Sequence, residues 1–319
     1  MQPIVSILMP AYNSSATIRA SIVSCLSQTF KDFELIILNS GSNDHTKEIV
    51  QSFNDNRIVY LEIAENKGIA ASRNILLKAS KGQFIAWLDA DDQMQAERLQ
   101  KQVDYLKLHP EIDILGSWIT TDSDEVPIKK LPLYHDLIKH GLWFKNCMIQ
   151  PAILSRNFYV EESVFYDENY ANSVEDYELW YRLRNVKKFG NIAETLTHYH
   201  MTTGDDLEHK RRVNGFENNL LKLWSIKWQF YNIKASDEQK SLFVEFLYEN
   251  KSLNEKDIYN LLHILNQLKL VEKDTCFDLL ISYHKLRLWR NMNPASKIKH
   301  LNLLLHLRAW PKLKHFYLV

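Results

Sequence analysis

The stretch Phe84-Ile85-Ala86-Trp87-Leu88-Asp89-Ala90-Asp91-Asp92 runs from an apolar segment into three carboxylates. Five apolar residues without a charge indicate a strand that is buried on both faces, as in parallel sheets covered by helices. In such sheets, ligands bind beyond the carboxyl ends of the strands. The acidic residues therefore mark the edge of the sheet at which a functional site is expected.

Three similar strand-to-helix units precede this stretch. The sequence predicts strands over 4–9, 34–38, 57–63 and 83–88, which alternate with helices over 14–27, 44–53, 69–80 and 95–108. This alternation predicts an α/β fold with a doubly wound, mostly parallel sheet and helices on both faces. Residues 111–203 are expected to mix strand and loop, with one helix near 174–184. Apolar spacing is helical after Gly204, so we expect an N-terminal domain over 1–204 and an all-helical C-terminal region over 205–319.

Composition limits the class of protein. With 45% hydrophobic residues and equal numbers of basic and acidic side chains, 39 of each, wholesale disorder is excluded. No apolar run approaches the length of about 20 residues that a transmembrane helix needs, and no secretory signal is visible, so a cytoplasmic protein is expected. Three scattered cysteines predict buried, reduced thiols. The closest glycines, Gly204 and Gly215, are too far apart for a dinucleotide or P-loop motif.

Charge is unevenly distributed along the chain. Residues 279–319 contain eight Lys or Arg and no acid, whereas the preceding residues hold 31 basic and 39 acidic side chains. A basic tail with aromatic residues predicts peripheral contact with an anionic membrane surface, on the inner face of the cell membrane. The alternative is a helix that packs on the domain and exposes its lysines. Nucleic acid is not an expected partner, because the body is acidic and has no base-stacking motif.

Polar residues also follow the first two strands. Pro10-Ala11-Tyr12 ends the first strand, where an aromatic ring can lie against a nucleobase. Asn39-Ser40 ends the second strand and can hydrogen-bond a base edge or a ribose. A plain turn with Asp44 as a helix cap is the alternative for this segment.

The acids after the fourth strand predict a cation. Clustered carboxylates repel each other unless a cation lies between them. Oxygen ligands suit Mn²⁺ or Mg²⁺, held partly by substrate phosphates. Helix-capping acids are the alternative. Arg73, one turn inside the third helix, suits a phosphate or a neighbouring carboxylate.

Taken in order, these segments resemble the inverting nucleotide-sugar glycosyltransferases of family 2, which have a GT-A-type fold. The family pattern V-S-I-I-x-P-x-Y-N is matched by 5–13, N-x-G-x-x-x-x-R-N by 66–74 and D-x-D-D by 89–92. An E-D pair on a helix is matched by Glu175-Asp176. The resemblance covers about residues 4–203. Asn39 and Ser40 replace the paired aspartates of the family, which weakens the case for a UDP-sugar donor.

The resemblance implies metal-dependent transfer, with inversion, from a nucleotide-sugar donor (a UDP-sugar favoured) to a hydroxyl of a glycan or lipid-linked acceptor. The setting it implies is bacterial surface polysaccharide or lipooligosaccharide synthesis. The implied donor-binding residues are Pro10, Ala11, Tyr12, Asn39, Ser40, Arg73, Asp89, Ala90 and Asp91. Mn²⁺ or Mg²⁺ would be held by Asp91 and Asp89, with His200 either a third ligand or a hydrogen-bonded structural histidine.

Asp176 is the implied base that takes the acceptor proton, with Glu175 beside it. Neighbouring residues on a helix point about 100° apart, so only one of the two is expected to reach the acceptor. The competing interpretation is a catalytically silent module that binds a nucleotide sugar or a protein on the same fold. A homo-oligomer is compatible with the sequence, which does not decide the acceptor or the linkage.

Overall fold

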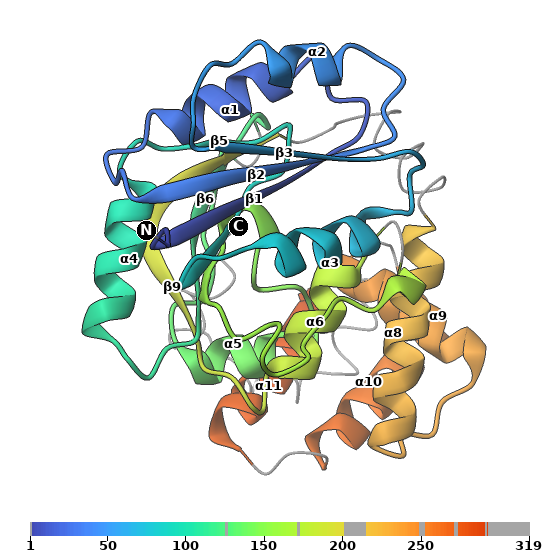
Figure 1. Cartoon of the computed structure of the whole chain (residues 1–319). Helices are drawn as coiled ribbons and strands as arrows, with labels where there is room; N and C mark the ends of the chain where they lie inside the picture. The colour runs from blue at the N-terminus through green and yellow to red at the C-terminus, as the bar shows by residue number, and fades with distance from the viewer. Residues whose placement is uncertain are drawn as a thin grey trace. The chain divides into compact units, whose positions relative to one another are not determined.

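The computed structural model describes residues 2–124, 127–170, 173–200, 215–248, 253–270, 274–290 and 292. Within these ranges the chain divides into two compact units, 2–142 with 146–200 and 143–145 with 215–292. The first unit contains the sheet and the second contains helices (Figure 1).

The sheet begins with the parallel strands that the sequence predicts. β1 (Val5–Ala11) lies between β2 (Phe33–Ser40) and β4 (Phe84–Trp87), and β3 (Ile58–Ile63) extends the sheet beyond β2. All three pairings are parallel, so the carboxyl ends of these strands meet at one edge. The α/β fold class is confirmed.

The other half of the sheet is mixed. Its strands are β8 (Leu154–Arg156), β6 (Ile114–Thr121), β9 (Phe189–Tyr199), β5 (Gln93–Met94) and β7 (Ile128–Lys129). β8 runs antiparallel to β4 and β6, β6 and β9 are parallel, and β5 and β7 are antiparallel additions. The sheet order is β3-β2-β1-β4-β8-β6-β9-β5, with β7 on β6.

Helices cover both faces of the parallel half. In Figure 1, α1 (Ile18–Leu26) and α2 (Thr46–Gln51) lie on one side of β1 to β3, and α3 (Ile69–Ala79) lies on the other. α1 buries Ile18, Ile22 and Cys25 in the same core as alternate residues of β1. Each buried isoleucine contributes about 1.5–3 kcal/mol by leaving water. The predicted helix over 95–108 is α4 (Arg98–Leu108).

Residues 111–200 contain more helix than predicted. α6 (Glu175–Leu183) is the expected helix, but α5 (His135–Gly141) and two 3₁₀ turns, η1 (Gln150–Ala152) and η2 (Glu168–Tyr170), were not expected. α5 has seven residues, fewer than two full turns at 3.6 residues per turn. A segment that short repeats its apolar spacing too few times to be recognised.

The second unit confirms the helical C-terminal region. It contains α8 (Phe216–Phe230), α9 (Asp237–Tyr248), α10 (Glu255–Lys269) and α11 (Thr275–Arg290). Trp224 and Trp228 both contact Phe243 edge to face, with ring centres 5.1 and 5.5 Å apart. Asn254 and Asp257 form a reciprocal cap that begins α10.

Most of the basic tail, residues 291 and 293–319, lies outside the described residues, so its membrane contact stays a prediction. No helix in the described ranges is both long enough and apolar enough to span a bilayer. Cys25 and Cys147 are buried as expected, but the prediction is wrong for Cys276, which is partly exposed on α11.

Candidate functional site

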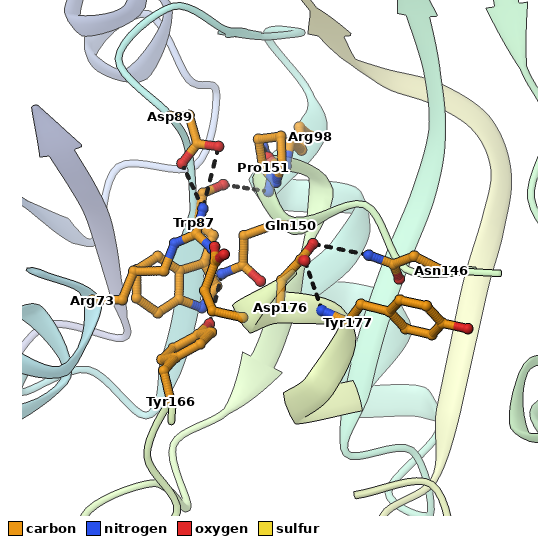
Figure 2. A network of polar contacts seen from close by, with 11 residues as sticks. Arg73, Trp87, Asp89, Arg98, Asn146, Gln150, Pro151, Tyr166, Asp176 and Tyr177 are labelled. Carbon is orange, nitrogen blue, oxygen red and sulfur yellow. Dashed lines mark hydrogen bonds and ion pairs between the residues drawn. The ribbon is translucent and has the colours of Figure 1, made fainter. Parts of the chain in front are cut away.

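A buried cation joins two acidic segments that lie far apart in the sequence. Arg73 of α3 donates from Nη2 to Asp89, 3.2 Å from Oδ1, and from Nη1 to Glu175 at the start of α6. Its side chain is only 4% exposed. The guanidinium lies beside the rings of Trp87 and Tyr166, 5.7 and 5.6 Å from their centres (Figure 2). The predicted site residues Arg73, Asp89 and Glu175 are therefore brought together.

α6 begins with an unusual backbone. Val174, just before the helix, has φ +68°, a left-handed conformation that costs energy for a β-branched residue. The first turn then carries Glu175 and Asp176, where the positive end of the helix dipole stabilises carboxylates. Burial raises the pKa of Glu175, and the charge of Arg73 opposes that rise. The strained residue Val174 therefore lies directly before the two acids, in the segment that places Glu175 against Arg73.

Asp176 has different partners from Glu175. Its Oδ2 accepts from Nδ2 of Asn146 at 2.9 Å, and its Oδ1 accepts from the backbone N–H of Tyr177 at 2.6 Å (Figure 2). Burial raises the pKa of this carboxyl, while Arg73 and these two donors lower it. Asp176 is partly exposed, whereas Glu175 is buried and forms the ion pair with Arg73. The two acids thus have separate surroundings, as their positions on the helix predict.

The acids after β4 are not equivalent. The Asp89 side chain is 26% exposed and pairs with Arg73, Asp91 is exposed, and Asp92 is buried. Oδ1 of Asp92 accepts from the backbone N–H of His200 at 2.7 Å, but its Oδ2 is buried and has no hydrogen-bond partner among the described residues. Burial raises the pKa of Asp92, and repulsion from Asp89 and Asp91 raises it further.

The residues in this region fit a hard divalent cation. An orphaned, buried carboxylate oxygen next to two more carboxylates offers the oxygen ligands that Mn²⁺ and Mg²⁺ prefer. In the described part of the chain, no three His, Cys, Asp or Glu side chains are already gathered around one point that could hold a metal. Part of the ligand shell would therefore come from substrate and water, as is usual for Mg²⁺.

The histidine pair is clamped by an acid that the sequence analysis missed. Both oxygens of Asp122 are engaged, one by Nε2 of His198 and the other by Nδ1 of His200. This confirms that His198 and His200 share a face. Asp122 directly follows β6, so the rule of polar residues at strand ends could have found it. In this structure the His200 ring has a carboxylate partner, and its backbone contacts Asp92.

The predicted base-binding residues lie side by side at the ends of β1 and β2. Ala11 pairs with Asn39 in the parallel ladder, and Tyr12, 48% exposed, follows directly. The loop after Tyr12 is tied to the loop after β2, because the N–H of Ser15 donates to Asp44. That loop structure is also why α1 begins later than predicted.

Asn39 and Ser40 already have internal partners. The Asn39 carbonyl accepts from the N–H of Ser42 at 3.1 Å, and its amide donates to the hydroxyl of Tyr60 at 3.0 Å. Ser40 receives a hydrogen bond from Ser72 at 3.1 Å. Both side chains are buried. Neither side chain therefore presents a free hydrogen-bond acceptor to solvent. The ring of Tyr12, in contrast, is exposed.

Two further supports could not be read from the sequence. Arg98 is fully buried and donates from Nη2 to the carbonyls of Trp87 and Ile153, at 3.0 and 3.1 Å, and from Nη1 to that of Pro151. Gln150 donates to the Tyr166 hydroxyl at 2.7 Å. These contacts fasten the end of β4 to η1, and η1 to the segment before η2, so the acidic edge rests on rigid elements (Figure 2). Only the tertiary structure shows what Arg98 does, because no local pattern marks it.

Comparison with known sequences gives consistent matches. Residues 6–202 match glycosyl transferase family 2. The chain is 31% identical to the UDP-Glc:alpha-D-GlcNAc-diphosphoundecaprenol beta-1,3-glucosyltransferase WfaP of Escherichia coli, over 70% of this chain and 88% of that protein. It is 44% identical to WfgD of Escherichia coli, which carries the same description, over 60% of this chain and 72% of that protein. An uncharacterised glycosyltransferase of Methanocaldococcus jannaschii is 31% identical over 77% of this chain and 84% of that protein.

Solved structures share the fold. S. aureus TarS 1–349 in complex with UDP aligns with a TM-score of 0.56 at 16% identity, over 91% of this chain and 89% of that one. The mannosyltransferase PcManGT from Pyrobaculum calidifontis, in complex with GDP-Man and Mn²⁺, aligns with a TM-score of 0.56 at 15% identity, over 98% and 87%. At such identities the likeness establishes the fold alone.

Proposed function

The chain belongs to glycosyl transferase family 2, and we propose from this that it moves a sugar, with inversion, from a UDP-sugar to a hydroxyl of a lipid-linked glycan. The single observation that carries the proposal is the arrangement of Asp89, Arg73, Glu175 and Asp176. One buried cation links the acids at the end of β4 to the helix that presents Asp176. The catalytic domain is proposed to cover residues 1–204.

In the proposed reaction, the acceptor oxygen attacks the anomeric carbon as the bond from that carbon to the diphosphate oxygen breaks. The acceptor proton passes to Asp176, the partly exposed carboxylate of the E-D pair, which is held by Asn146 and the N–H of Tyr177. Attack opposite the leaving group inverts the anomeric centre. General base catalysis of this kind typically contributes 10²- to 10⁴-fold.

The other site residues act on the donor. Tyr12 would lie against the base, with Pro10, Ala11, Asn39 and Ser40 forming the floor beneath it. Asp91 and Asp89, and His200 if its ring leaves Asp122, would hold Mn²⁺ or Mg²⁺. Bound there, the ion would neutralise charge on the departing diphosphate. Ala90 anchors the loop that carries these acids, because its carbonyl accepts from the Ser21 hydroxyl at 2.9 Å.

Donor and acceptor classes rest on the named relatives. WfaP and WfgD are described as using UDP-Glc and GlcNAc-diphosphoundecaprenol, which supports a UDP-sugar and a polyprenyl-diphosphate-linked acceptor for bacterial surface polysaccharide. Such an acceptor would place the enzyme on the inner face of the membrane, with the basic tail of residues 279–319 as the contact. Flotation with anionic vesicles, comparing the full chain with one ending at Asn293, tests this: equal flotation of both contradicts it.

The transferase proposal is tested by presenting UDP-, GDP-, CMP- and dTDP-sugars with Mn²⁺ and GlcNAc-diphosphate lipid, and by following product configuration by NMR. We expect a UDP-sugar to stabilise the protein, by about 2.7 kcal/mol at a hundredfold excess over Kd. Asp91→Ala should lose this stabilisation. Asp176→Asn should keep donor binding and lose transfer.

One observation favours a second candidate, the silent binding module. Asn39 and Ser40 are buried and bonded, unlike side chains that await a ligand. Stabilisation by a nucleotide sugar without transfer to any acceptor would support that module. If no nucleotide sugar stabilises the protein, the transferase proposal fails, and the second candidate is reduced to a module that binds a protein. A product that retains the donor's anomeric configuration would overturn inversion.

A further inference from the structure

The first unit has a concavity on the side of the sheet formed by β6 and β9. It has a volume of about 810 Å³, and its lining includes Trp118, Ile128 and Leu196. That volume lies within the range of small-molecule sites, about 300–1,000 Å³. None of its lining residues belongs to the site described above. The groove is therefore separate from that site.

Two irregularities in the β6–β9 ladder shape this groove. Ser117 pairs with Ile192, Trp118 with Thr195 and Ile119 with Thr197, so the register shifts on both sides of Trp118. The extra residues on β9 are Ala193, Glu194 and Leu196, and all three line the groove. Bulges redirect side chains and are frequent beside functional sites. Here they place an aromatic ring and a carboxylate in one hollow.

A hydrogen bond fixes the orientation of the Trp118 ring. Its indole N–H donates to the carbonyl of Leu131 at 3.0 Å, and its side chain is partly exposed. Nζ of Lys130 lies 5.4 Å from its ring centre. An indole face carries the negative part of its quadrupole, which suits the polarised C–H groups on one face of a pyranose ring. A hydrogen-bond donor for sugar hydroxyls thus stands next to an apolar platform.

The charged groups of the groove balance one another. Glu194 accepts from Lys101 at 2.7 Å, and Lys101 also pairs with Glu97 at 3.0 Å. With Lys130, the lining holds two acids and two bases. Thr29, Thr195 and Gln95 add uncharged polar groups. This lining suits a neutral ligand with many hydroxyls better than a phosphate or an acidic glycan.

The groove is continuous with the exposed face of β6, which leads to Asp122 and the two histidines that it contacts. Trp118, Thr120 and Asp122 alternate with the buried residues Ile119 and Thr121, so they share the more exposed face of β6. Thr120 lies 3.1 Å from Nδ1 of His198, and Asp122 holds both histidines. Trp118 and Asp122 are four residues apart on this strand, a separation of about 13 Å.

We propose that this groove is a second saccharide site, which binds a neutral segment of an acceptor glycan longer than the single GlcNAc of the relatives' acceptor. Trp118 stacks on a pyranose ring, and Glu194, Lys130 and Gln95 bind its hydroxyls. The identity of that glycan as the acceptor rests on the proposed function. Binding in the groove does not, because it requires neither donor nor metal.

The test measures binding of neutral tetrasaccharides by NMR, without nucleotide sugar or metal. The probes are laminaritetraose and chitotetraose, with a hyaluronan tetrasaccharide as the anionic comparison. We expect at least one neutral probe to bind with a Kd near 1 mM and to shift the Trp118 indole resonance. Trp118→Ala should weaken binding about tenfold or more, and Trp118→Phe should retain most of it.

Two further variants keep the result interpretable. Ile128→Arg blocks the groove from an exposed position and should also abolish binding without removing the Trp118 hydrogen bond. Tyr134→Ala, at an aromatic residue 71% exposed and outside the groove, should leave binding unchanged. The proposal is overturned if no neutral probe binds, if the anionic probe binds more tightly, or if Trp118→Ala and Ile128→Arg bind like the wild type. Saccharide binding in a protein that shows no sugar transfer would instead refute only the proposed function.

Discussion

Arg73 and Glu175 are 102 residues apart in the sequence and form an ion pair in which both side chains are buried, 4% and 7% exposed. The pair connects the third helix of the parallel half to the helix that carries Asp176. Because Arg73 also contacts Asp89, its charge is shared between the two acidic segments of the site. Stability and function are therefore expected to depend on the same side chain.

Removing the cation should destabilise the first unit strongly. Arg73→Met leaves the Glu175 carboxylate buried without its partner, a change that typically costs about 3–5 kcal/mol. Adding Glu175→Gln should recover part of the loss, because it removes the uncompensated charge. Urea unfolding followed by circular dichroism measures both. The exposed pair of Lys47 and Glu62 is the control, and Lys47→Met should cost less than about 1 kcal/mol. A similar cost at both positions would contradict the role given to the buried pair.

Asn146 should determine the pH at which kcat/KM falls on the acid side of the pH profile. Its amide donates to Asp176, and this hydrogen bond favours the charged carboxylate. In Asn146→Ala the pKa of Asp176 should rise, so kcat/KM should fall at a higher pH on the acid side than in the wild type. The pH profile of kcat/KM measures the shift. Asn169→Ala, which removes a similar hydrogen bond to the partly exposed Asp167, should leave the profile in place. If the acid side of the kcat/KM profile lies at the same pH in Asn146→Ala as in the wild type, Asn146 does not have this role.

His135 should make the first unit less stable in mild acid. Burial, helped by the charge of Lys188, lowers the pKa of His135 to about 4, and its Nδ1 accepts from the N–H of Phe189 at 3.2 Å. The unfolded chain, with a pKa of about 6.5, binds the proton more readily. Stability should therefore be full above about pH 6.5 and should fall as the pH drops toward 4.

The urea midpoint measured at several pH values tests this. His135→Gln should reduce the fall between pH 6.5 and 4, because the group that takes up the proton on unfolding is gone. His45, whose ring is 88% exposed, provides the matched control. If the His135→Gln and His45→Gln proteins lose stability with acid as steeply as each other, the burial of His135 does not drive the effect.

The cysteines should differ in reactivity toward a thiol reagent. Burial raises the pKa of Cys25 to about 12, so almost none of it is thiolate at pH 8. Cys276 is partly exposed. We expect rapid modification of the folded protein at Cys276 and modification of Cys25 only in urea, measured by absorbance with an aromatic disulfide. Cys276→Ser should abolish the fast phase, whereas Cys25→Ser should preserve it. Rapid loss of Cys25 in the folded protein would contradict this.

Local pattern was enough for the elements of the parallel half. Apolar runs of strand length, such as 84–88, are typical of central strands buried on both faces, and helical spacing between them predicts the covering layers. The E-D pair was placed on a helix from its neighbours alone, and α6 begins at Glu175. Short elements such as α5 and the 3₁₀ turns η1 and η2 were missed, because fewer than two turns repeat the apolar spacing too few times to be detected.

Candidate site residues could be identified from sequence because strand ends of a parallel sheet converge. That geometry brings Tyr12, Asn39 and Asp89 to one edge whatever the loops do. Their partners could not be identified in the same way. Asn39 turned out to be occupied by Ser42 and Tyr60, and Asp176 by Asn146, since each of these contacts depends on how separate loops pack.

The layered fold, the acidic edge after β4 and the family of the chain follow from residue type and short-range periodicity, so they can be predicted from the amino-acid sequence alone. The position of Arg73 between Asp89 and Glu175, the contacts of Asp122 with the two histidines and the bulged ladder beside Trp118 became visible in the folded chain. The physical reason is that hydrogen bonds and ion pairs between distant segments act over a few ångströms. They are specified by the packing that brings the segments together, not by the residues adjacent in the chain.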